Sequence, residues 1–181
     1  MGAIASYRRV LLIVAAFSRY PDALQWAREQ AEIEWGPIVL ESDLFDHAET
    51  HYYDASMGTG LKKTFWAFQQ LVDPGVLPQL KIRANAWEDE YKQVSVCPET
   101  RPLNLDPGYL TEAKLVLAST KDRDHRLYLR DGVYAEGTLY FNEGTWKTRP
   151  WTYPDYQRAD YHEFFTRCRE YLRRRYKEDS A

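Results

Sequence analysis

The first third of the chain carries a hydrophobic pattern that changes period twice. Residues 10–17 are continuously apolar, as expected for a strand that is covered on both faces. From Pro21 onward, apolar residues recur at every third or fourth position and end before Gly36, which predicts a helix of about four turns. Residues 37–45 read as a second strand. This strand, helix, strand order favours a parallel pair joined by a right-handed crossover.

The middle of the chain has weaker patterns. Residues 61–72 place Leu61, Phe65 and Phe68 on one helical face, so we expect a helix there. Residues 77–94 fit a helix in part, but the stretch "LKIRA" alternates like a strand, which favours a short strand that runs into a helix. Residues 95–110 are rich in turn formers and are expected to form a loop.

The last third returns to strand patterns. Three strands are predicted at 114–120, 125–130 and 133–141, and Asp131-Gly132 predicts a two-residue type I′ hairpin turn. A final helix begins near Tyr161. We therefore expect an α+β fold in one domain over 1–181, with a mixed sheet, an N-terminal β-α-β unit, a C-terminal antiparallel hairpin and a terminal helix.

Composition narrows the class of protein. Hydrophobic residues make up 44% of the chain and charged residues 28%, with a net charge of -3, so the chain can form a packed core. The basic tail at 166–178 favours a solvated helix end over a nucleic-acid surface. Cys97 and Cys168 are too few for a disulfide framework, and no apolar stretch is long enough for a membrane helix. We expect a cytoplasmic protein without a membrane partner.

Familiar catalytic motifs do not fit. The stretch 58–64, "GTGLKKT", resembles a P-loop, but Lys62 and Met57 stand where that motif needs glycine. No motif for dinucleotides, zinc proteases or serine hydrolases occurs. His47 and His51 lie among acidic residues and have metal-ligand chemistry, yet a solvated acidic loop explains them better because no regular scaffold flanks them.

The predicted hairpin raises a question about its polar residues. With a two-residue turn, Leu127 lies opposite Glu136, and His125 lies diagonal to that carboxylate on the same face. Arg126 then lies opposite Gly137 on the other face. Glu136 and His125 can be an acid/base pair or a structural ion pair across the sheet, and the sequence leaves both readings open.

Further polar and aromatic residues surround this hairpin in the sequence. Arg101, Lys121 and Arg126 suit a phosphate or carboxylate, which guanidinium groups bind at two points. Ion pairing with nearby aspartates is the alternative for each of them. The aromatic stretch 151–156 is suited to stacking on a base or sugar ring, or to anchoring the last helix.

Five segments together resemble an uncharacterised prokaryotic family, the domain-of-unknown-function family 4416. They are "HYYDASMG", "RPLNLDPGYL", "KLVLASTKDRDHRLYL", "GVYAEGTL" and "WTYPDY". The resemblance implies an intracellular single-domain protein. This chain has Ser56 where the family places an acid before the Met-Gly pair. The recurring family positions are Tyr53, Asp54, Arg101, Asn104, Asp106, Lys121, His125, Arg126, Glu136, Tyr153 and Asp155.

These observations lead to one expectation and one alternative. We expect a pocket for an anionic small molecule, phosphorylated or nucleotide-like, with acid/base catalysis by Glu136, His125 and Asp106. A non-enzymatic module that binds protein or single-stranded RNA is the alternative. No cofactor is identified, and a divalent metal on Asp54 and Asp106 is left open. The expected ligand-binding residues are Arg101, Asn104, Lys121, Arg126, Tyr53, Tyr153 and Asp155.

Overall fold

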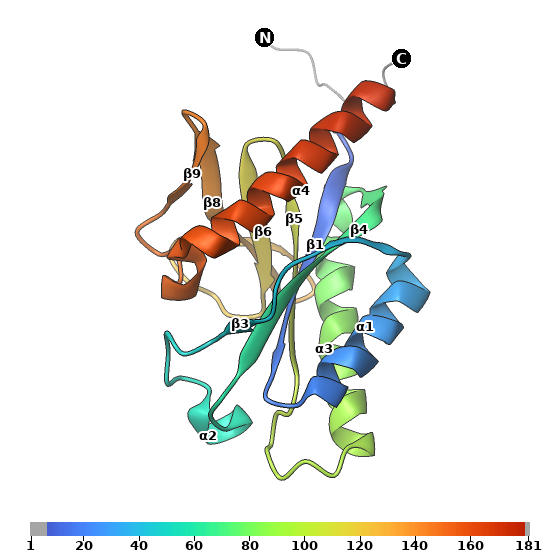
Figure 1. Cartoon of the computed structure of the whole chain (residues 1–181), viewed down its shortest axis with the longest axis vertical. Coiled ribbons are helices and arrows are strands. Elements are labelled where there is room, and N and C mark those ends of the chain that lie inside the picture. The colour runs from blue at the N-terminus through green and yellow to red at the C-terminus, as the bar shows by residue number, and fades with distance from the viewer. Residues whose placement is uncertain (1–6, 180–181) are drawn as a thin grey trace.

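The computed structural model describes residues 7–179 and shows a nine-stranded sheet with helices on both faces (Figure 1). The strands are β1 (Val10–Ser18), β2 (Ile38–Glu41), β3 (Phe45–Asp46), β4 (Lys62–Val72), β5 (Asn104–Leu110), β6 (Lys114–Ser119), β7 (Leu127–Arg130), β8 (Val133–Asn142) and β9 (Thr145–Thr148). The helices are α1 (Pro21–Trp35), α2 (Asp54–Met57), α3 (Leu77–Val94) and α4 (Ala159–Glu178), with 3-10 turns η1 (Pro74–Val76) and η2 (Pro154–Gln157).

The central strand β1 is buried on both faces, which explains its continuous apolar sequence. Leu11 and Ile13 pack in the core under α4, together with Phe164 and Phe165 of that helix. The alternate residues of β1 pack on the other face, against α1 and α3. Successive side chains of a strand point to opposite faces. The sheet is thus covered by α4 on one side and by α1 and α3 on the other (Figure 1).

The strand order is β2-β4-β1-β5-β6-β8-β7, with β3 on β4 and β9 on β8. Every strand pair in residues 7–179 is antiparallel. The α+β class, the late hairpin and the terminal helix are confirmed. The N-terminal β-α-β unit is present, but β1 and β2 are not neighbours, because β4 lies between them and pairs antiparallel with both. The sheet of the described residues is therefore antiparallel, where a mixed sheet with a parallel pair was expected.

The prediction of a helix at 61–72 was wrong, since this stretch forms β4. The four consecutive apolar residues 65–68 are buried, two under α4 and two against α1 and α3. A helix would have turned some of them to solvent. Pairing with β1 on one side and β2 and β3 on the other decided the structure, because tertiary context overrides a weak local period.

Two further predictions in the middle of the chain were also wrong. The stretch from Leu77 to Val94 is helical throughout, without the short strand. The predicted loop at 95–110 contains strand β5, although Pro107 and Gly108 lie inside it. Proline is tolerated in a strand where no ladder bond needs its N–H. Pro107 pairs with β1 alone, because the ladder between β5 and β6 begins at Gly108.

Two hairpin turns shape the late part of the sheet. Asp131 and Gly132 have φ values of 54° and 73°, as the type I′ prediction requires. Glu143 and Gly144 have φ values of 50° and 80° and join β8 to β9, a strand that the sequence patterns did not indicate.

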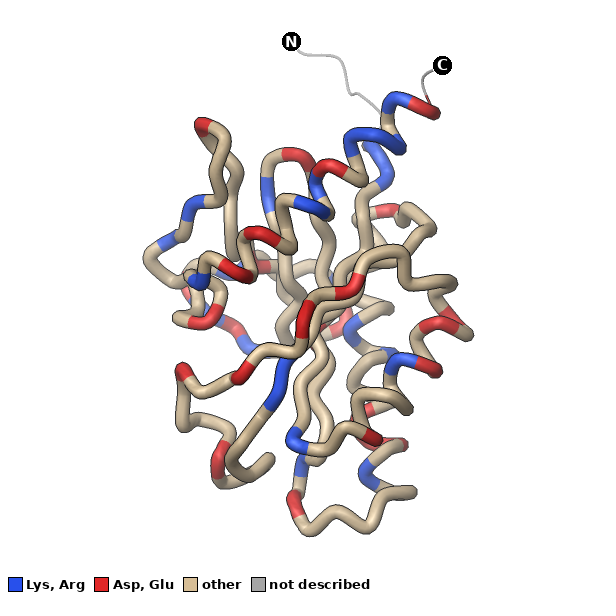
Figure 2. The backbone as a smooth tube through the Cα atoms, viewed as in Figure 1, with Lys and Arg blue, Asp and Glu red and all other residues tan. Residues whose placement is uncertain are grey.

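The basic tail lies along the C-terminal part of α4, where Figure 2 shows Lys and Arg gathered near the helix end. Several of these side chains have partners on the protein. Arg173 pairs with Glu112 at 3.3 Å, and Arg175 donates to the backbone carbonyl of Gln69 at 2.9 Å. Within residues 7–179, none of the helices has the length and apolar character needed to cross a membrane.

Candidate functional site

A cavity of about 710 Å³ lies where β5 and β6 part. Their ladder ends at Gly108 and Leu117, yet β5 continues along β1 to Asn104 and β6 continues along β8 to Ser119. Both unpaired segments line the cavity. Gly108 stands at the end of this ladder, where the backbones of β5 and β6 approach closely. A Cβ at this position would lie 2.3 Å from the carbonyl oxygen of Val116, so a side chain does not fit here. The volume is typical of sites for small molecules.

Helix α3 supplies the groups that a neighbouring strand would have given to the open edge of β5. The backbone N–H of Leu105 donates to Glu88 Oε1 at 2.7 Å, and Lys81 Nζ donates to the carbonyl of Leu105 at 2.9 Å. Alternate residues direct their backbone groups to the same edge, so Pro107 would be next in line, and it has no N–H to satisfy. The parting of the strands therefore leaves no backbone group of Leu105 unpaired.

Asp106 lies in the cavity wall beside this lysine. Lys81 Nζ donates to Asp106 Oδ1 at 2.9 Å, and Asn104 Nδ2 donates to Oδ2 at 2.8 Å. Burial opposes the charged carboxylate, but the charge and hydrogen bond of Lys81 outweigh it and lower the pKa of Asp106 to about 2. A carboxylate with this pKa is a weak proton acceptor at neutral pH. The geometry favours a positioning role over the predicted general-base role.

The cavity brings together ten of the eleven residues that the sequence singled out. Their chemical roles stay predictions, but their common location is a feature of the fold. The ten that line the cavity are Tyr53, Arg101, Asn104, Asp106, Lys121, His125, Arg126, Glu136, Tyr153 and Asp155.

The hairpin that carries three of these residues has a different register from the predicted one. The ladder pairs Leu127 with Ala135, and an irregularity between Tyr128 and Arg130 inserts an extra residue. The predicted pairing of Leu127 with Glu136 was wrong. An extra residue in one strand changes the face to which the side chains beyond it point, counted here from the turn back toward Arg126. As a result Arg126 shares a face with Glu136.

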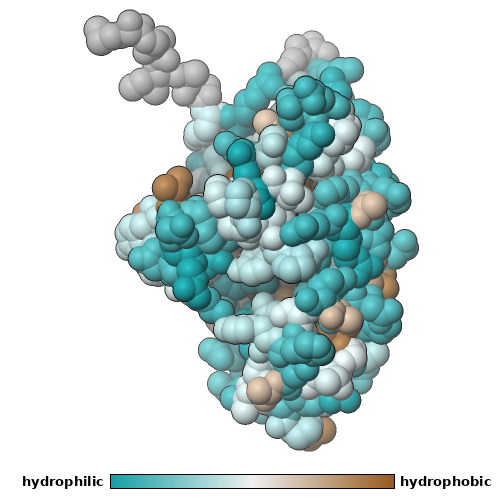
Figure 3. Space-filling model, turned by 90° about the vertical axis from the view of Figure 1, so that its left-hand side faces the viewer, coloured by the Kyte–Doolittle hydropathy of each residue, from teal (hydrophilic) through white to brown (hydrophobic). Residues whose placement is uncertain are grey.

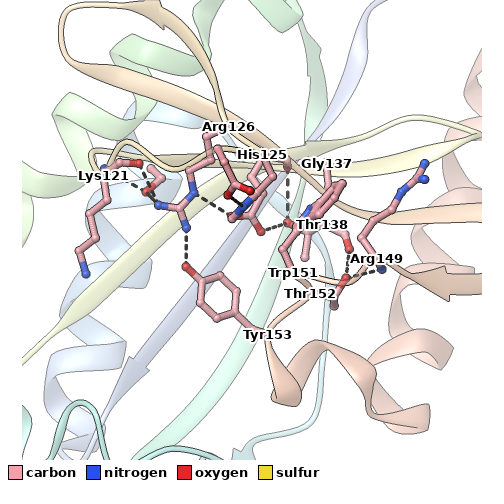
Figure 4. A network of polar contacts seen from close by, with 12 residues as sticks. Lys121, His125, Arg126, Gly137, Thr138, Arg149, Trp151, Thr152 and Tyr153 are labelled. Carbon is pink, nitrogen blue, oxygen red and sulfur yellow. Dashed lines mark hydrogen bonds and ion pairs between the residues drawn. The ribbon is translucent and has the colours of Figure 1, made fainter.

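Arg126 is the centre of a buried polar network (Figure 4). Its Nε donates to Glu136 Oε2 at 2.9 Å, and its Nη2 donates to the hydroxyl of Tyr153 at 2.6 Å. Its Nη1 donates to Ser119 Oγ at 2.8 Å and to the carbonyl of Lys121 at 2.9 Å. Four hydrogen bonds leave the guanidinium little capacity for a ligand oxyanion.

His125 occupies the cavity side of the same network. Its Nε2 lies 3.2 Å from Glu136 Oε2, and its Nδ1 lies 3.1 Å from Asp124 Oδ1. The ring stacks on Trp151 with centroids 5.1 Å apart and planes inclined by 12°. Glu136 also accepts a bond from Thr138 Oγ1 at 3.3 Å, and it is only 2% exposed. Glu136 thus orients both Arg126 and His125, and the His125 side chain is 15% exposed at the cavity, against 2% for Glu136.

The aromatic loop after β9 is fastened to β8 (Figure 4). Trp151 Nε1 donates to the carbonyl of Gly137 at 3.1 Å, and Thr152 Oγ1 donates to the carbonyl of Thr138 at 2.6 Å. Both bonds reach backbone groups of the strand. They hold Trp151 against His125 and place Tyr153 within reach of Arg126, so the loop is a wall of the cavity.

The charges of the cavity are mostly paired. Arg101 donates from Nε and Nη2 to Glu88 Oε2 at 3.1 and 2.9 Å. Three cations were predicted to bind an anion, namely Arg101, Lys121 and Arg126. Glu88 neutralises Arg101, and Glu136 neutralises Arg126. Among the described residues, Lys121 and Arg123 line the cavity without a carboxylate partner. Lys121 Nζ instead donates to the hydroxyl of Tyr52 at 2.9 Å, and this bond lowers the pKa of that phenol.

The inner wall contains a buried lysine, Lys63, that the sequence patterns did not select. Lys63 Nζ donates to Asp155 Oδ2 at 2.6 Å, and both side chains are buried. His47 is buried beside them, with Nδ1 at 3.6 Å from the same oxygen. Lys63 was missed because its segment was expected to be helical. In a strand, its position two residues before Phe65 places it on the same face as that core residue.

Of the two residues left open as metal ligands, Asp106 lines the cavity and Asp54 does not. Asp54 lies outside the cavity and contacts exposed His51, whose Nδ1 is 2.9 Å from Asp54 Oδ2. Asp106 is engaged by Lys81 and Asn104. Within residues 7–179, no group of three or more His, Cys, Asp or Glu side chains is arranged to hold a metal ion.

A comparison with protein families identifies the chain. The model of the family described as Domain of unknown function (DUF4416) matches residues 8–171. The chain belongs to this family. Neither the curated proteins nor the solved structures give a match. The matched part of the DUF4416 chain includes all ten predicted residues that line the cavity.

Proposed function

We propose that this protein binds a small anionic molecule, phosphorylated or nucleotide-like, in the cavity between β5 and β6. The observation that carries the proposal is the charge arrangement at the exposed side. Lys121 and Arg123 are exposed and have no carboxylate partner among the described residues, whereas the buried cations of the cavity are all paired. An anion gains most from charges that are not already neutralised.

Aromatic rings next to these cations suit a ligand that carries a ring. Tyr52 lies under Lys121, with the ammonium 4.7 Å from the ring centroid, and Trp151 is partly exposed at the cavity. A base or sugar ring can stack on such side chains while its phosphate reaches the cations. This combination favours a nucleotide-like or sugar-phosphate ligand over a simple inorganic anion.

Acid/base chemistry, if the bound molecule is turned over, falls to His125. The imidazole lines the cavity and is oriented by Glu136 and by its stacking on Trp151. A base held by a buried carboxylate is a recurring arrangement for proton transfer. Replacing Glu136 by Gln is expected to lower turnover at least tenfold while leaving ligand affinity within about twofold, because the carboxylate contacts His125 and not the ligand.

The binding proposal is tested by thermal shift against nucleotides, sugar phosphates and short RNA. A ligand at about 100 times its Kd stabilises by about 2.7 kcal/mol, which raises Tm by about 5 to 10 °C for a chain of this size. The shift should fall in Lys121→Ala and Arg123→Ala. Lys114→Ala is the matched control, because Lys114 is exposed on β6 and lies outside the cavity. Equal shifts in all three variants would remove the exposed cations from the site.

Single-stranded RNA is the second candidate, and one observation favours it. Tyr52, Trp151 and Tyr153 expose 67%, 37% and 45% of their surface beside the same cations. Exposed rings and cations form stacking platforms for unpaired bases. The surface in Figure 3 carries its hydrophobic residues in small separate patches, which gives less support to a protein partner on that face. Affinity for RNA that falls steeply with salt and ignores sequence would support this candidate.

We also propose a cytoplasmic location. The support is that Cys97 and Cys168 are both free and that Cys168 is buried in the core, as in proteins of reducing compartments. Recovery of the tagged protein in the soluble fraction of gently lysed cells is the expected result, and recovery with secreted or surface proteins would contradict it.

A further inference from the structure

The inner end of the cavity holds a buried histidine without a hydrogen-bond partner. Both ring nitrogens of His47 are inaccessible to solvent, and neither makes a hydrogen bond among the described residues. The nearest carboxylate oxygens, on Asp155 and Glu49, lie 3.6 and 3.7 Å from Nδ1, beyond hydrogen-bond distance. An unpaired buried polar group destabilises the folded state, so proteins seldom leave one without a reason.

His47 is held in place by contacts other than hydrogen bonds of its ring. Its backbone N–H donates to the carbonyl of Leu61 at 2.9 Å. The ring packs against Phe17, with centroids 4.9 Å apart, and against Tyr53 at 5.9 Å. The imidazole is thus preorganised in the cavity wall with its polar atoms unused.

Lys63 has spare hydrogen-bonding capacity at the same place. Its ammonium has three donors and makes one hydrogen bond, to Asp155 Oδ2, among the described residues. The aromatic ring of Tyr156 covers another side, with its centroid 4.3 Å from Nζ. His47 Nδ1 and Lys63 Nζ lie 3.6 and 2.6 Å from the same carboxylate oxygen, Asp155 Oδ2, so the two side chains converge at one point of the cavity wall.

The charge balance indicates which kind of group fits. Lys63 is paired with Asp155, and Glu49 is paired with Arg158 at 2.7 Å. Burial and the neighbouring Lys63 lower the pKa of His47, so its ring is neutral and offers one donor and one acceptor. A second anion would meet three nearby carboxylates, since Asp106 also acts on His47. An uncharged group that both donates and accepts, a hydroxyl above all, meets no such penalty.

We infer that the inner end of the cavity is a subsite for a hydroxyl-bearing part of the ligand, held by His47 and Lys63, while the anionic group stays at Lys121 and Arg123. The inference rests on the proposed function and narrows it. The ligand class becomes a phosphate ester of a polyhydroxylated molecule, such as a sugar phosphate or the ribose phosphate part of a nucleotide. Inorganic phosphate engages only the exposed side.

The test compares ribose phosphate, ribose and inorganic phosphate by isothermal titration. Wild type should bind ribose phosphate more tightly than either other probe. His47→Phe keeps the ring packing but removes both polar atoms, and it should weaken ribose phosphate roughly five- to tenfold. Its affinity for inorganic phosphate should not change. His47→Gln restores a donor and an acceptor and should recover part of the loss. His51→Phe is the matched control, because His51 is 93% exposed in its side chain and lies outside the cavity.

The possible results separate the two proposals. Ribose phosphate binding that is weakened by Lys121→Ala but unchanged by His47→Phe overturns the inner subsite and leaves the proposed function standing. Equal losses for ribose phosphate and inorganic phosphate in His47→Phe also overturn it, since His47 would then act on the anion. If neither phosphate binds the wild type at millimolar concentration, the anion proposal and the subsite both fail.

Discussion

Two buried ion pairs face the same cavity and are built in different ways. Arg126 and Glu136 lie in a network in which the guanidinium donates four hydrogen bonds and the carboxylate accepts from three side chains. Lys63 and Asp155 share one hydrogen bond, and the ammonium is otherwise enclosed by the rings of aromatic residues. The first pair is saturated with protein partners, whereas the second keeps unused donors.

This difference separates a pair that holds the fold from one that is available for a ligand. A planar guanidinium with four of its five N–H donors engaged joins β6, β7, β8 and the aromatic loop at fixed geometry. An ammonium among rings is stabilised by less directional cation–π attraction, which leaves its N–H groups free to turn toward an oxygen atom in the cavity. The bonds of Arg126, one of the three cations that the sequence suggested as anion ligands, favour a structural role, and the unused donors of Lys63, which the sequence analysis did not select, favour contact with a ligand.

Removing Arg126 should produce the largest effect. Arg126→Ala leaves Glu136 buried with an uncompensated charge, and such losses typically cost about 3 to 5 kcal/mol of unfolding free energy. Lys63→Met also leaves a buried carboxylate, Asp155, without its cation, but it removes one hydrogen bond and not four, so a loss near the lower end of this range, about 3 kcal/mol, is expected. Urea unfolding of both variants measures the difference. Arg130→Ala, on the exposed part of the same hairpin, should change stability by about 0.5 kcal/mol or less.

A Lys63→Met variant that costs as much as Arg126→Ala would contradict the distinction between the two pairs. A loss in Arg126→Ala no greater than in Arg130→Ala would show that the buried network does not stabilise the hairpin.

Replacing Arg126 by Lys and Lys63 by Arg tests the same comparison, with smaller expected losses of unfolding free energy. Arg126→Lys keeps the positive charge but cannot reach Glu136, Ser119 and Tyr153 at once, so a loss of about 1 to 2 kcal/mol is expected. Lys63→Arg brings a larger group into a site enclosed by rings and should cost about 1 to 3 kcal/mol through overpacking. Both values come from urea unfolding at neutral pH. A neutral effect of Arg126→Lys would mean that charge alone, without the fork geometry, holds this region together.

The sequence predicted correctly those elements whose local pattern fits either a helix or a strand, but not both. Strand β1, helices α1 and α4 and the Asp131-Gly132 turn follow from periodicity and turn chemistry, and all are present. Strand β4 was misread because its aromatic and apolar residues satisfy a helical period as well as a buried strand. Strand β5 was misread because Pro107 and Gly108 break most strands. They are tolerated here since the ladder with β6 ends at Gly108, a fact of tertiary structure that no local pattern contains.

The sequence indicated which residues line the site, but not which of them bond to one another. Ten residues chosen for their chemistry line one cavity, but their pairing depends on a bulge of one residue and on side chains of α3. Glu88 and Lys81 were not selected, because no local pattern shows that α3 directs them to the open edge of β5. His47 was read as a metal ligand or, in preference, as part of a solvated acidic loop. The second reading was wrong for His47, because the position of β4 in the sheet buries it beside Lys63.

The pH dependence of stability should differ between wild type and His47→Phe. Burial and Lys63 lower the pKa of His47, so in acid the unfolded chain takes up a proton that the folded protein resists. This contribution is fully present above the unfolded pKa of about 6.5 and is lost as pH falls below it, by at most about 1.4 kcal/mol per pH unit. Glu49 and Asp155 face the ring and oppose the shift, while Lys63 reinforces it. Urea unfolding at several pH values should show a gap that favours His47→Phe and widens below 6.5; a constant gap would show that His47 titrates normally in the folded state.

The smallest expected effect is a change in the pKa of His47 without a change in the fold. Lys63→Met removes a charge that lowers the pKa of His47 and leaves Asp155, which raises it, without its partner. The pKa of His47 should therefore rise, as measured by NMR of the imidazole protons. Among the four histidines of the chain, the His47 signal is assigned by its loss in His47→Phe. Lys62→Ala, which removes an exposed neighbour paired with Asp46, should leave the midpoint in place. An unchanged midpoint in Lys63→Met would mean that burial alone keeps His47 neutral. A raised one would show that the loosely bonded lysine sets the charge of the inner cavity, a role that the saturated Arg126 cannot perform there.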